Sequence, residues 1–346
     1  MRGLAAAYGR GLAGAVVLLA ALWMLALILL PQLVMVERSL WSTERPEGAY
    51  AVTAQIDALY QDVTLLGMDE AAAQGAERAR IAAEIEAKQA EIARLETEEL
   101  APRKVYGFQN YTRMRGLHLY IFARTILYAV LVTLLALAAC YPIAYAVATK
   151  EGKGAARLML LLVIPYAINE LLRVYAWLMI LDYQGVINSL LAALGLVSFK
   201  DRTWIPFLEW PASVFLAMVY AYILFMVFPI YNTIETLDKN QIEAARDLGA
   251  STVMIHRRVV IPHAKPGIAV GCIMTFMLSA GSYAVPQIMT RGQGGDWFSQ
   301  LVYRQFFEAN NWNIGAAYAF ALLLACLAFV FLVMRLFGVG IRDIVE

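Results

Sequence analysis

Two charged side chains, Glu170 and Arg173, lie three residues apart within an otherwise apolar stretch of the sequence. This spacing places both on one face of a helix. Ionisable groups inside a membrane are costly and usually face a cavity or a partner. The two residues therefore have two interpretations: an ion pair that holds helices together, or part of a path for a polar solute. On such a path, Glu170 would attract an ammonium group, and Arg173 would restrain it or contact a carboxylate.

Aromatic and polar side chains near these charges could complete such a path. The aromatic rings could form a cation–π wall, although aromatic residues near the ends of spans are also common interfacial anchors. Gly281, followed by Pro286, predicts a locally broken helix whose freed backbone groups can bind a solute. With Glu170 and Arg173, the candidate residues of the path are Tyr166, Tyr175, Trp177, Ser282, Tyr283 and Gln287.

A second group of polar residues forms a strip over residues 238–262, between two stretches long enough to cross a membrane. Asp238 is typical of an N-cap residue, so we expect a helix to begin directly after it. Gly249 fits the left-handed position that ends such a helix. Ser251 can then cap a second short helix, which we expect Pro262 to end. The strip thus predicts a short, rigid helix–turn–helix that projects from the membrane.

The residue types of this strip are those of a docking surface for a soluble partner. Ala244 and Ala245 lack bulk and would let a partner approach closely, while Glu243 offers a charge for anchoring. A loop that merely joined two spans would not need two capped helices.

The elements that must position these residues are membrane helices. Apolar residues make up 61% of the chain and charged residues 16%, with a mean hydropathy of +0.61. These values lie outside the ordinary range of soluble domains. The sequence therefore predicts an all-α membrane protein with six transmembrane helices, since about 20 apolar residues span a bilayer. The six stretches that are long enough and nearly uncharged are 11–36, 125–149, 158–181, 210–234, 266–290 and 309–334.

The distribution of lysine and arginine predicts the orientation of these spans. With both termini in the cytoplasm, the cytoplasmic segments carry most of these residues. The two short outer loops then hold only Lys200, Arg202, Arg291 and Arg304. The polar strip consequently faces the cytoplasm. The net charge of +1 says nothing about partners, but the lack of a basic stripe indicates no nucleic acid partner.

The segment between the first two spans, residues 37–118, is an extracytoplasmic insertion in this orientation. Apolar residues at helical spacing predict helices over 54–66 and 69–100. A break near residues 67–69 would let them fold back as an antiparallel helical hairpin. Two interpretations stay open for the hairpin: a solvated, charged insertion that is merely tolerated, or a docking surface for an extracytoplasmic partner.

The polar strip also carries a sequence signature. Glu243, Ala244 and Ala245 are followed by Gly249 and then by Ile261-Pro262. This pattern resembles the EAA loop of binding-protein-dependent ABC importer permeases, in which the loop forms a coupling helix that sits in a cleft of the ATPase subunit. His256 departs from the family, which usually has phenylalanine there, but a ring is retained. The resemblance implies an ATPase-coupling role for Glu243, Ala244, Ala245, Asp247, Gly249, Ser251, His256 and Pro262.

Two further stretches, 165–177 and 282–286, resemble spermidine/putrescine-type permeases. The resemblance implies the first permease of such a system, with the type I ABC importer permease fold over residues 1–346. It also implies partners: an ABC ATPase dimer, a second permease that is related but not identical, and an extracytoplasmic solute-binding protein. Ser282 stands where family members often have an acidic residue. Another amine, an amino acid or an opine-like solute is therefore an alternative to a polyamine.

Other classes of protein fit the sequence less well. A membrane enzyme would need convergent catalytic or metal-binding residues, and the chain has three histidines with no HExxH or CxxC motif. A sensory receptor would leave the polar strip unexplained. The chain has no GxxxxGKS/T P-loop, so we expect ATP and Mg²⁺ in the ATPase partner. We expect no catalytic residue, cofactor or metal site in this chain. We expect a multi-pass protein of the bacterial inner membrane that is in contact with lipid.

Overall fold

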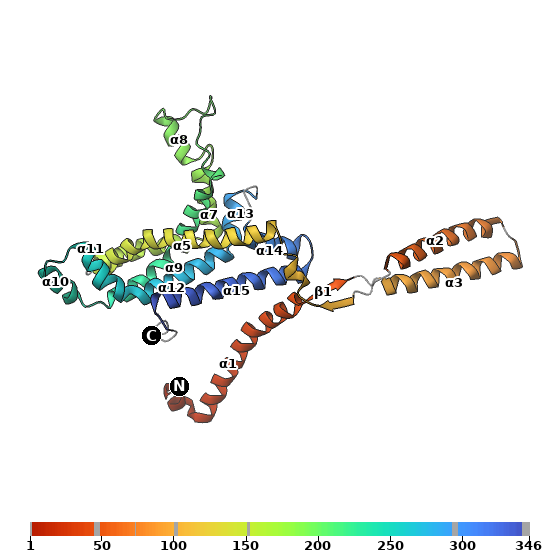
Figure 1. Cartoon of the computed structure of the whole chain (residues 1–346), viewed down its shortest axis with the longest axis horizontal. Helices are drawn as coiled ribbons and strands as arrows, with labels where there is room; N and C mark the ends of the chain where they lie inside the picture. Colours follow the sequence, from red (N-terminus) through yellow and green to blue (C-terminus); the bar gives the residue numbers. More distant parts are fainter. Residues whose placement is uncertain are drawn as a thin grey trace. The chain divides into compact units, whose positions relative to one another are not determined.

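The computed structural model describes residues 2–44, 49–72, 74–99, 103–150, 153–292 and 297–340. The chain divides into two compact units, Met1–Arg113 and Met114–Glu346. Each unit is built almost entirely of helices (Figure 1). The predicted single transmembrane domain over 1–346 stays a prediction.

The first unit begins with helix α1 (Arg2–Ser39). Its part from Gly14 to Ser39 is long and apolar enough to cross a membrane, which agrees with the predicted span over 11–36. Large apolar side chains such as Leu19 and Leu33 are exposed along it within the unit. Exposed apolar surface of this kind suits a helix that is surrounded by lipid.

Helices α2 (Ala49–Ala72) and α3 (Ala76–Glu99) form the predicted antiparallel hairpin. The less exposed side chains of α3 recur at positions 81, 85, 88, 92 and 95, and this alternation of four and three is typical of a coiled coil. Ile56 and Ile92 are buried in the hairpin. Lys88 belongs to the same row, and its ammonium lies 2.7 Å from the Asp62 carboxylate, which raises the pKa of Lys88.

The turn of the hairpin lies at Gly75, so the predicted break near residues 67–69 is wrong. Gly75 has a φ of +69°, whereas Gly67 lies within α2. A glycine inside a helix costs only about 1 kcal/mol. The less exposed side chains of α2 continue past Gly67 to Glu70 at the same spacing as those of α3. Arg78, on the other side of the turn, forms an ion pair with Glu70. Continued packing therefore outweighs the helix-weakening effect of one glycine.

A small sheet at the base of the hairpin is absent from the sequence prediction. Strands β1 (Trp41–Glu44) and β2 (Arg103–Tyr106) pair antiparallel, with Trp41 opposite Tyr106. The Lys104 ammonium lies 4.5 Å from the centre of the Trp41 ring, a diagonal cross-strand contact. The short helix α4 (Gln109–Thr112) follows, and Asn110 donates hydrogen bonds to the carbonyl oxygens of Ser39 and Trp41.

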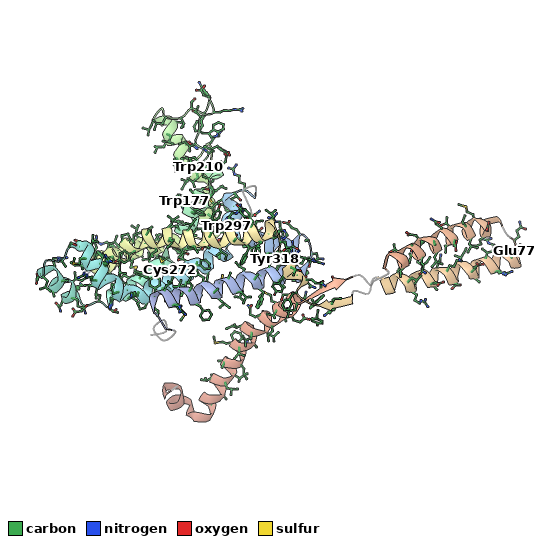
Figure 2. The ribbon with its side chains drawn as sticks, in the orientation of Figure 1. Glu77, Trp177, Trp210, Cys272, Trp297 and Tyr318 are labelled. Atoms are coloured by element: carbon green, nitrogen blue, oxygen red, sulfur yellow. The ribbon has the colours of Figure 1, made fainter. Side chains whose placement is uncertain are left out.

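The second unit is a bundle of long apolar helices: α5 (Leu117–Thr149), α9 (Pro211–Glu235), α12 (Ile261–Gly281) and α15 (Trp312–Phe337). Helix α12 packs against α5, α9 and α15, and Cys272 lies inside the bundle (Figures 1 and 2). Small side chains let the backbones approach closely, as at Gly267, where a Cβ would collide with α9. This bundle holds the second to sixth spans, except for the third.

The third predicted span, 158–181, is not one continuous helix. The chain forms α6 (Lys153–Val163), the 3₁₀ turn η1 (Ile164–Ala167) and then α7 (Glu170–Leu181). Pro165 explains the interruption, because it lacks the N–H that an α-helix interior requires. Helix α7 continues after a short break into α8 (Val186–Ala193), and the two together are long and apolar enough to span. The spanning stretch is therefore shifted toward the C-terminus.

Two other spans are also interrupted. Helix α9 bends by 48° between Ala221 and Ile223, and its two parts are long and apolar enough to cross a membrane only when they are taken together. Helix α12 ends at Gly281, so the predicted span 266–290 breaks before the short helix α13 (Ala284–Met289). The 3₁₀ turn η2 (Phe207–Glu209) precedes α9, and α14 (Phe298–Phe307) precedes α15. In the described ranges, five helices can cross a membrane, or six with the bent pair.

Candidate functional site

The first helix of the polar strip is α10 (Lys239–Asp247), and its two ends are capped as predicted. The Asp238 carboxylate accepts a hydrogen bond from the Asn240 N–H at 3.0 Å. At the other end, Gly249 has a φ of +80°, a left-handed conformation that favours glycine. The Gly249 N–H donates to the carbonyl oxygen of Arg246, and the Ala250 N–H donates to that of Ala245. These two bonds form a Schellman motif, which fixes the turn after α10.

The second helix begins at Ser251 as predicted, but it does not end at Pro262. The Ser251 hydroxyl accepts from the Met254 N–H and caps α11 (Thr252–Ile255). A π-helical turn, η3 (His256–Val260), then leads directly into α12. Pro262 lies in the first turn of α12, where its missing N–H removes little hydrogen bonding. The strip is therefore one short helix followed by the entrance to a membrane helix.

Most of the predicted coupling residues lie on the surface of this loop. Glu243, Ala244, Asp247, Gly249 and Ser251 are exposed, and so is Pro262, whereas Ala245 is half-buried against the bundle core. Sequence reasoning missed two apolar residues of the same surface, Leu248 and Val253, which are 88% and 76% exposed. Their signal is an apolar side chain in a strip that charge counting places in the cytoplasm. Exposed apolar side chains on a rigid loop are suited to bind a protein.

His256 contacts its own subunit rather than the loop surface. Its Nδ1 lies 2.7 Å from the hydroxyl of Tyr141 on α5, and its ring meets that of Tyr145 edge-on at 4.4 Å between centroids. These contacts tie the entrance of α12 to the end of α5. The ATPase-coupling role of His256 stays a prediction, and the structure makes any such role indirect.

Tyr166, in η1, holds the bend of α9. Its hydroxyl donates to the carbonyl oxygen of Ala221 at 2.8 Å and accepts from the Leu224 N–H at 3.2 Å. These backbone groups flank the bend, which disrupts the regular helical ladder there. The interrupted third span and the bent fourth span therefore meet at one phenol group.

Arg173 is buried beside Tyr166 and does not form an ion pair with Glu170. The guanidinium lies 4.0 Å from the centre of the Tyr166 ring, and the side chain is 8% exposed. Its Nε and Nη1 donors have no hydrogen-bond partner in the part of the chain that the structure describes. Glu170 is exposed at the start of α7, and no ion pair joins it to Arg173. The ion-pair interpretation is thus wrong, and the guanidinium retains donors for another group.

The other predicted path residues fall into two places. Tyr175 is exposed on α7, and Trp177 meets Tyr220 of α9 edge-on. Ser282 is buried at the predicted helix break, and its carbonyl oxygen accepts from the Ser299 hydroxyl.

Tyr283 and Gln287 line a cavity of about 240 Å³ beside α14, and Arg173 is not among its lining residues. There Tyr283 stacks on Tyr303, and Gln287 accepts a hydrogen bond from Gln300. The structure does not assign these two residues to the same pocket as Tyr166 and Arg173.

Cofactor and metal chemistry finds no support in the described ranges. No group of three or more His, Cys, Asp or Glu residues is arranged there to hold a metal ion. Cys140, Cys272 and Cys326 are buried and unpaired to one another.

Apolar spans, buried polar groups at helix breaks and a capped surface loop describe a multi-pass helical membrane protein. Residues 141–342 match the family described as "Binding-protein-dependent transport system inner membrane component". The match covers more than half of the chain, so the chain belongs to this family.

Curated relatives and solved structures agree with this membership. The spermidine/putrescine transport system permease protein PotB of Escherichia coli (strain K12) is 33% identical over 216 residues, which cover 62% of this chain and 77% of that protein. The inner membrane ABC transporter permease protein YdcU of the same organism is 31% identical over 228 residues, with coverage of 62% and 71%. A bacterial alginate ABC transporter crystallised with an alginate pentasaccharide-bound periplasmic protein shares the fold, with a TM-score of 0.55, 17% identity and coverage of 68% and 85%.

Proposed function

We propose that this chain is one permease subunit of an ATP-driven importer that carries spermidine or putrescine across the bacterial inner membrane. The observation that carries the proposal is its 33% identity to PotB over 77% of that protein. The exposed, doubly capped loop around α10 supports it independently, because a subunit without a P-loop must receive its energy from a partner.

The proposed energy route runs through this loop. Leu248 and Val253 would enter a cleft of an ABC ATPase, and Glu243 and Asp247 would anchor its rim. Closure of the ATPase dimer on ATP and Mg²⁺ would then move the loop. The cap at Asp238 and the Schellman turn make α10 stiff, so a push on its surface reaches α9 and α12, which leave the loop at its two ends.

The second proposed partner is another permease, related to this chain but not identical. Helices α7 and α8 expose large apolar side chains, among them Leu172, Met179, Leu190 and Leu194. Lipid can cover such surface, and so can a second bundle. An extracytoplasmic solute-binding protein would dock on the opposite side from α10. The hairpin of α2 and α3 is placed on that side by the proposed topology, in which both termini are cytoplasmic.

The proposed solute path passes Arg173 and three interruptions of spans: the 3₁₀ turn η1, the bend of α9 and the end of α12 at Ser282. Broken helices line transport sites because their backbone groups can bind cargo. Arg173 also favours a second candidate, a solute that carries a carboxylate, such as an amino acid. Its buried Nε and Nη1 donors would find acceptors in that group.

Uptake into liposomes tests both candidates. The complete complex, with the ATPase, second permease and binding protein, is reconstituted and supplied with ATP inside or outside. We expect ATP-dependent accumulation of labelled putrescine or spermidine, and none with a non-hydrolysable nucleotide. Accumulation of amino acids with no polyamine uptake would favour the second candidate. A complex that carries neither class of solute would contradict the proposal.

A further inference from the structure

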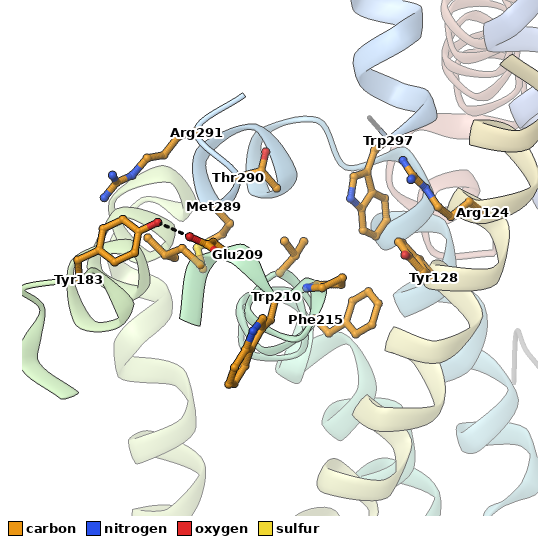
Figure 3. A pocket seen from close by; sticks show the side chains of 13 residues that line it. Arg124, Tyr128, Tyr183, Glu209, Trp210, Phe215, Met289, Thr290, Arg291 and Trp297 are labelled. Carbon is orange, nitrogen blue, oxygen red and sulfur yellow. Dashed lines mark hydrogen bonds between the residues drawn. The ribbon is translucent and has the colours of Figure 1, made fainter. Parts of the chain in front are cut away.

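A cavity of about 530 Å³ lies in the second unit, at the end of the bundle away from α10. It is formed by α5, by the start of α9, by η2 and by the end of α13 (Figure 3). Helix α9 begins at this cavity and leads at its other end into α10, so the cavity and the coupling loop lie at opposite ends of one helix. The cavity would therefore open on the extracytoplasmic side.

Aromatic rings form much of the cavity wall. Tyr128 meets Phe215 edge-on at 5.1 Å between centroids and lies 5.7 Å from Trp297. Trp210 and Tyr183 line other parts of the wall (Figure 3). Aromatic faces carry partial negative charge and attract ammonium groups. Two of the five rings come from helices α5 and α9 and three from residues beside α7, η2 and α14, and none of them is part of the proposed path at Arg173.

The charges around the cavity leave one carboxylate open to a ligand. Glu209 accepts a hydrogen bond from the Tyr183 hydroxyl at 2.9 Å, and within the described ranges no cation is paired with it. Arg291 is paired with Asp182 and lies near the Tyr183 ring. Glu209 therefore presents a negative charge at an aromatic wall.

Arg124 limits how many positive charges can enter. Its guanidinium lies 5.5 Å and 5.8 Å from the Tyr120 and Tyr128 ring centres, across the cavity from Glu209 (Figure 3). The Tyr128 ring is therefore already in contact with a cation, which leaves less of its face to an ammonium group. One ammonium group at Glu209, with an apolar chain against the rings, suits this arrangement best.

We propose that this cavity binds the terminal alkylammonium group of an amine on the extracytoplasmic side, with Glu209 as its counter-ion and Trp210 and Tyr183 as its aromatic contacts. That the amine is the transported solute rests on the proposed function. The same chemistry could come from the ethanolamine headgroup of a phospholipid. Nothing in the proposal depends on the path at Arg173.

Direct binding tests the site separately from transport. The complex without its solute-binding protein is placed in nanodiscs of anionic phosphatidylglycerol and titrated with labelled putrescine. We expect Glu209→Gln to weaken binding about tenfold or more, as expected for loss of one charge-assisted contact. Asp201→Asn, an exposed acid of the same outer loop that does not line the cavity, is the matched control and should leave affinity unchanged. Trp210→Leu should also weaken binding.

A second arm distinguishes the source of the amine. If the ligand is a lipid, phosphatidylethanolamine should co-purify with the wild-type complex and be lost from the Glu209→Gln variant. The inference is overturned if neither putrescine binding nor lipid retention depends on Glu209 while melting curves show all variants folded. Glu209-dependent binding without polyamine uptake would refute the proposed function but support the amine site. Polyamine uptake with Glu209-independent binding would support the proposed function but refute the amine site.

Discussion

Gly267 is the position where the fold is most sensitive to a single added methyl group. A Cβ there would lie 2.8 Å from the carbonyl carbon of Pro229 and still closer to that group's oxygen and to Oγ1 of Thr233. Ordinary contact begins at 3.4 Å, so α12 would have to withdraw from α9 by at least about 0.6 Å (3.4 minus 2.8). A gap of that size forfeits about a quarter or more of the dispersion energy of the contacts it opens.

We therefore expect Gly267→Ala to destabilise the protein by about 3 kcal/mol, at the upper end of the range for overpacked cores. For a unit of this size, this change lowers the melting temperature by roughly 6 to 12 °C. Two glycines of the same helix provide controls. At Gly271 the Cβ would meet the flexible Met226 sulfur at 2.8 Å, and at Gly281 it would meet nothing within 4 Å.

The assay is thermal unfolding of the detergent-solubilised complex, followed by the fraction that stays monodisperse on size exclusion. The expected order of stability is Gly281→Ala close to wild type, Gly271→Ala lower and Gly267→Ala lowest. If Gly267→Ala melts at the wild-type temperature, the close packing of α9 and α12 described above is incorrect.

Three further predictions concern the loop and the helix breaks. Gly249→Val should abolish ATP-driven uptake, because a left-handed φ costs an L-residue about 1–2 kcal/mol and the turn after α10 would change. Membrane insertion and the melting temperature should stay normal, because α10 has no buried residue. Gly249→Asn, which tolerates that φ, should retain uptake, and equal uptake by both variants would contradict this. Tyr166→Phe should lower stability by about 1–3 kcal/mol, measured by thermal unfolding, because it leaves the Ala221 and Leu224 backbone groups unpaired; the exposed Tyr175→Phe is the control, and equal melting of the two would count against the bend. Arg173→Met should leave the melting temperature unchanged or raise it, because two buried unpaired donors disappear, and it should reduce uptake. A lower melting temperature with normal uptake would make Arg173 a structural residue only.

The capped loop shows what local sequence can predict. Asp238, Gly249 and Ser251 act through hydrogen bonds to residues two to four positions away, so their types alone predict both caps. The effect of Pro262 was harder to predict, because a proline disrupts the interior of a helix but is accommodated in the first turn. Whether Pro262 lies in an interior or a first turn depends on where the next helix begins, and the π-helical turn before that helix has no simple sequence signal.

Contacts between distant segments could not be predicted. An ion pair between Glu170 and Arg173 was one of two interpretations, because the two share a helix face by spacing. In the fold, Glu170 is exposed at the start of α7, while Arg173 lies against Tyr166, seven residues earlier across a 3₁₀ break. The hairpin turn failed for a similar reason: its position depends on packing of α2 against α3, and no residue at 67–69 reports that packing. Composition alone predicted where the apolar spans occur along the chain, but not the interruption and shift of the third span or the break of the fifth at Gly281.

If the ATPase drives transport through the loop around α10, it must cover Leu248 when it is bound. The native cysteines Cys140, Cys272 and Cys326 are buried, so a Leu248→Cys variant carries the one readily accessible thiol of the described residues. Its rate of labelling by a maleimide is measured in membranes with and without the co-expressed ATPase subunit. Met68→Cys, at a similarly exposed apolar position of the hairpin, is the control. We expect the ATPase to protect the Leu248→Cys thiol and to leave the Met68→Cys thiol unaffected. Equal labelling of Leu248→Cys in both membranes would show that the ATPase does not cover this loop.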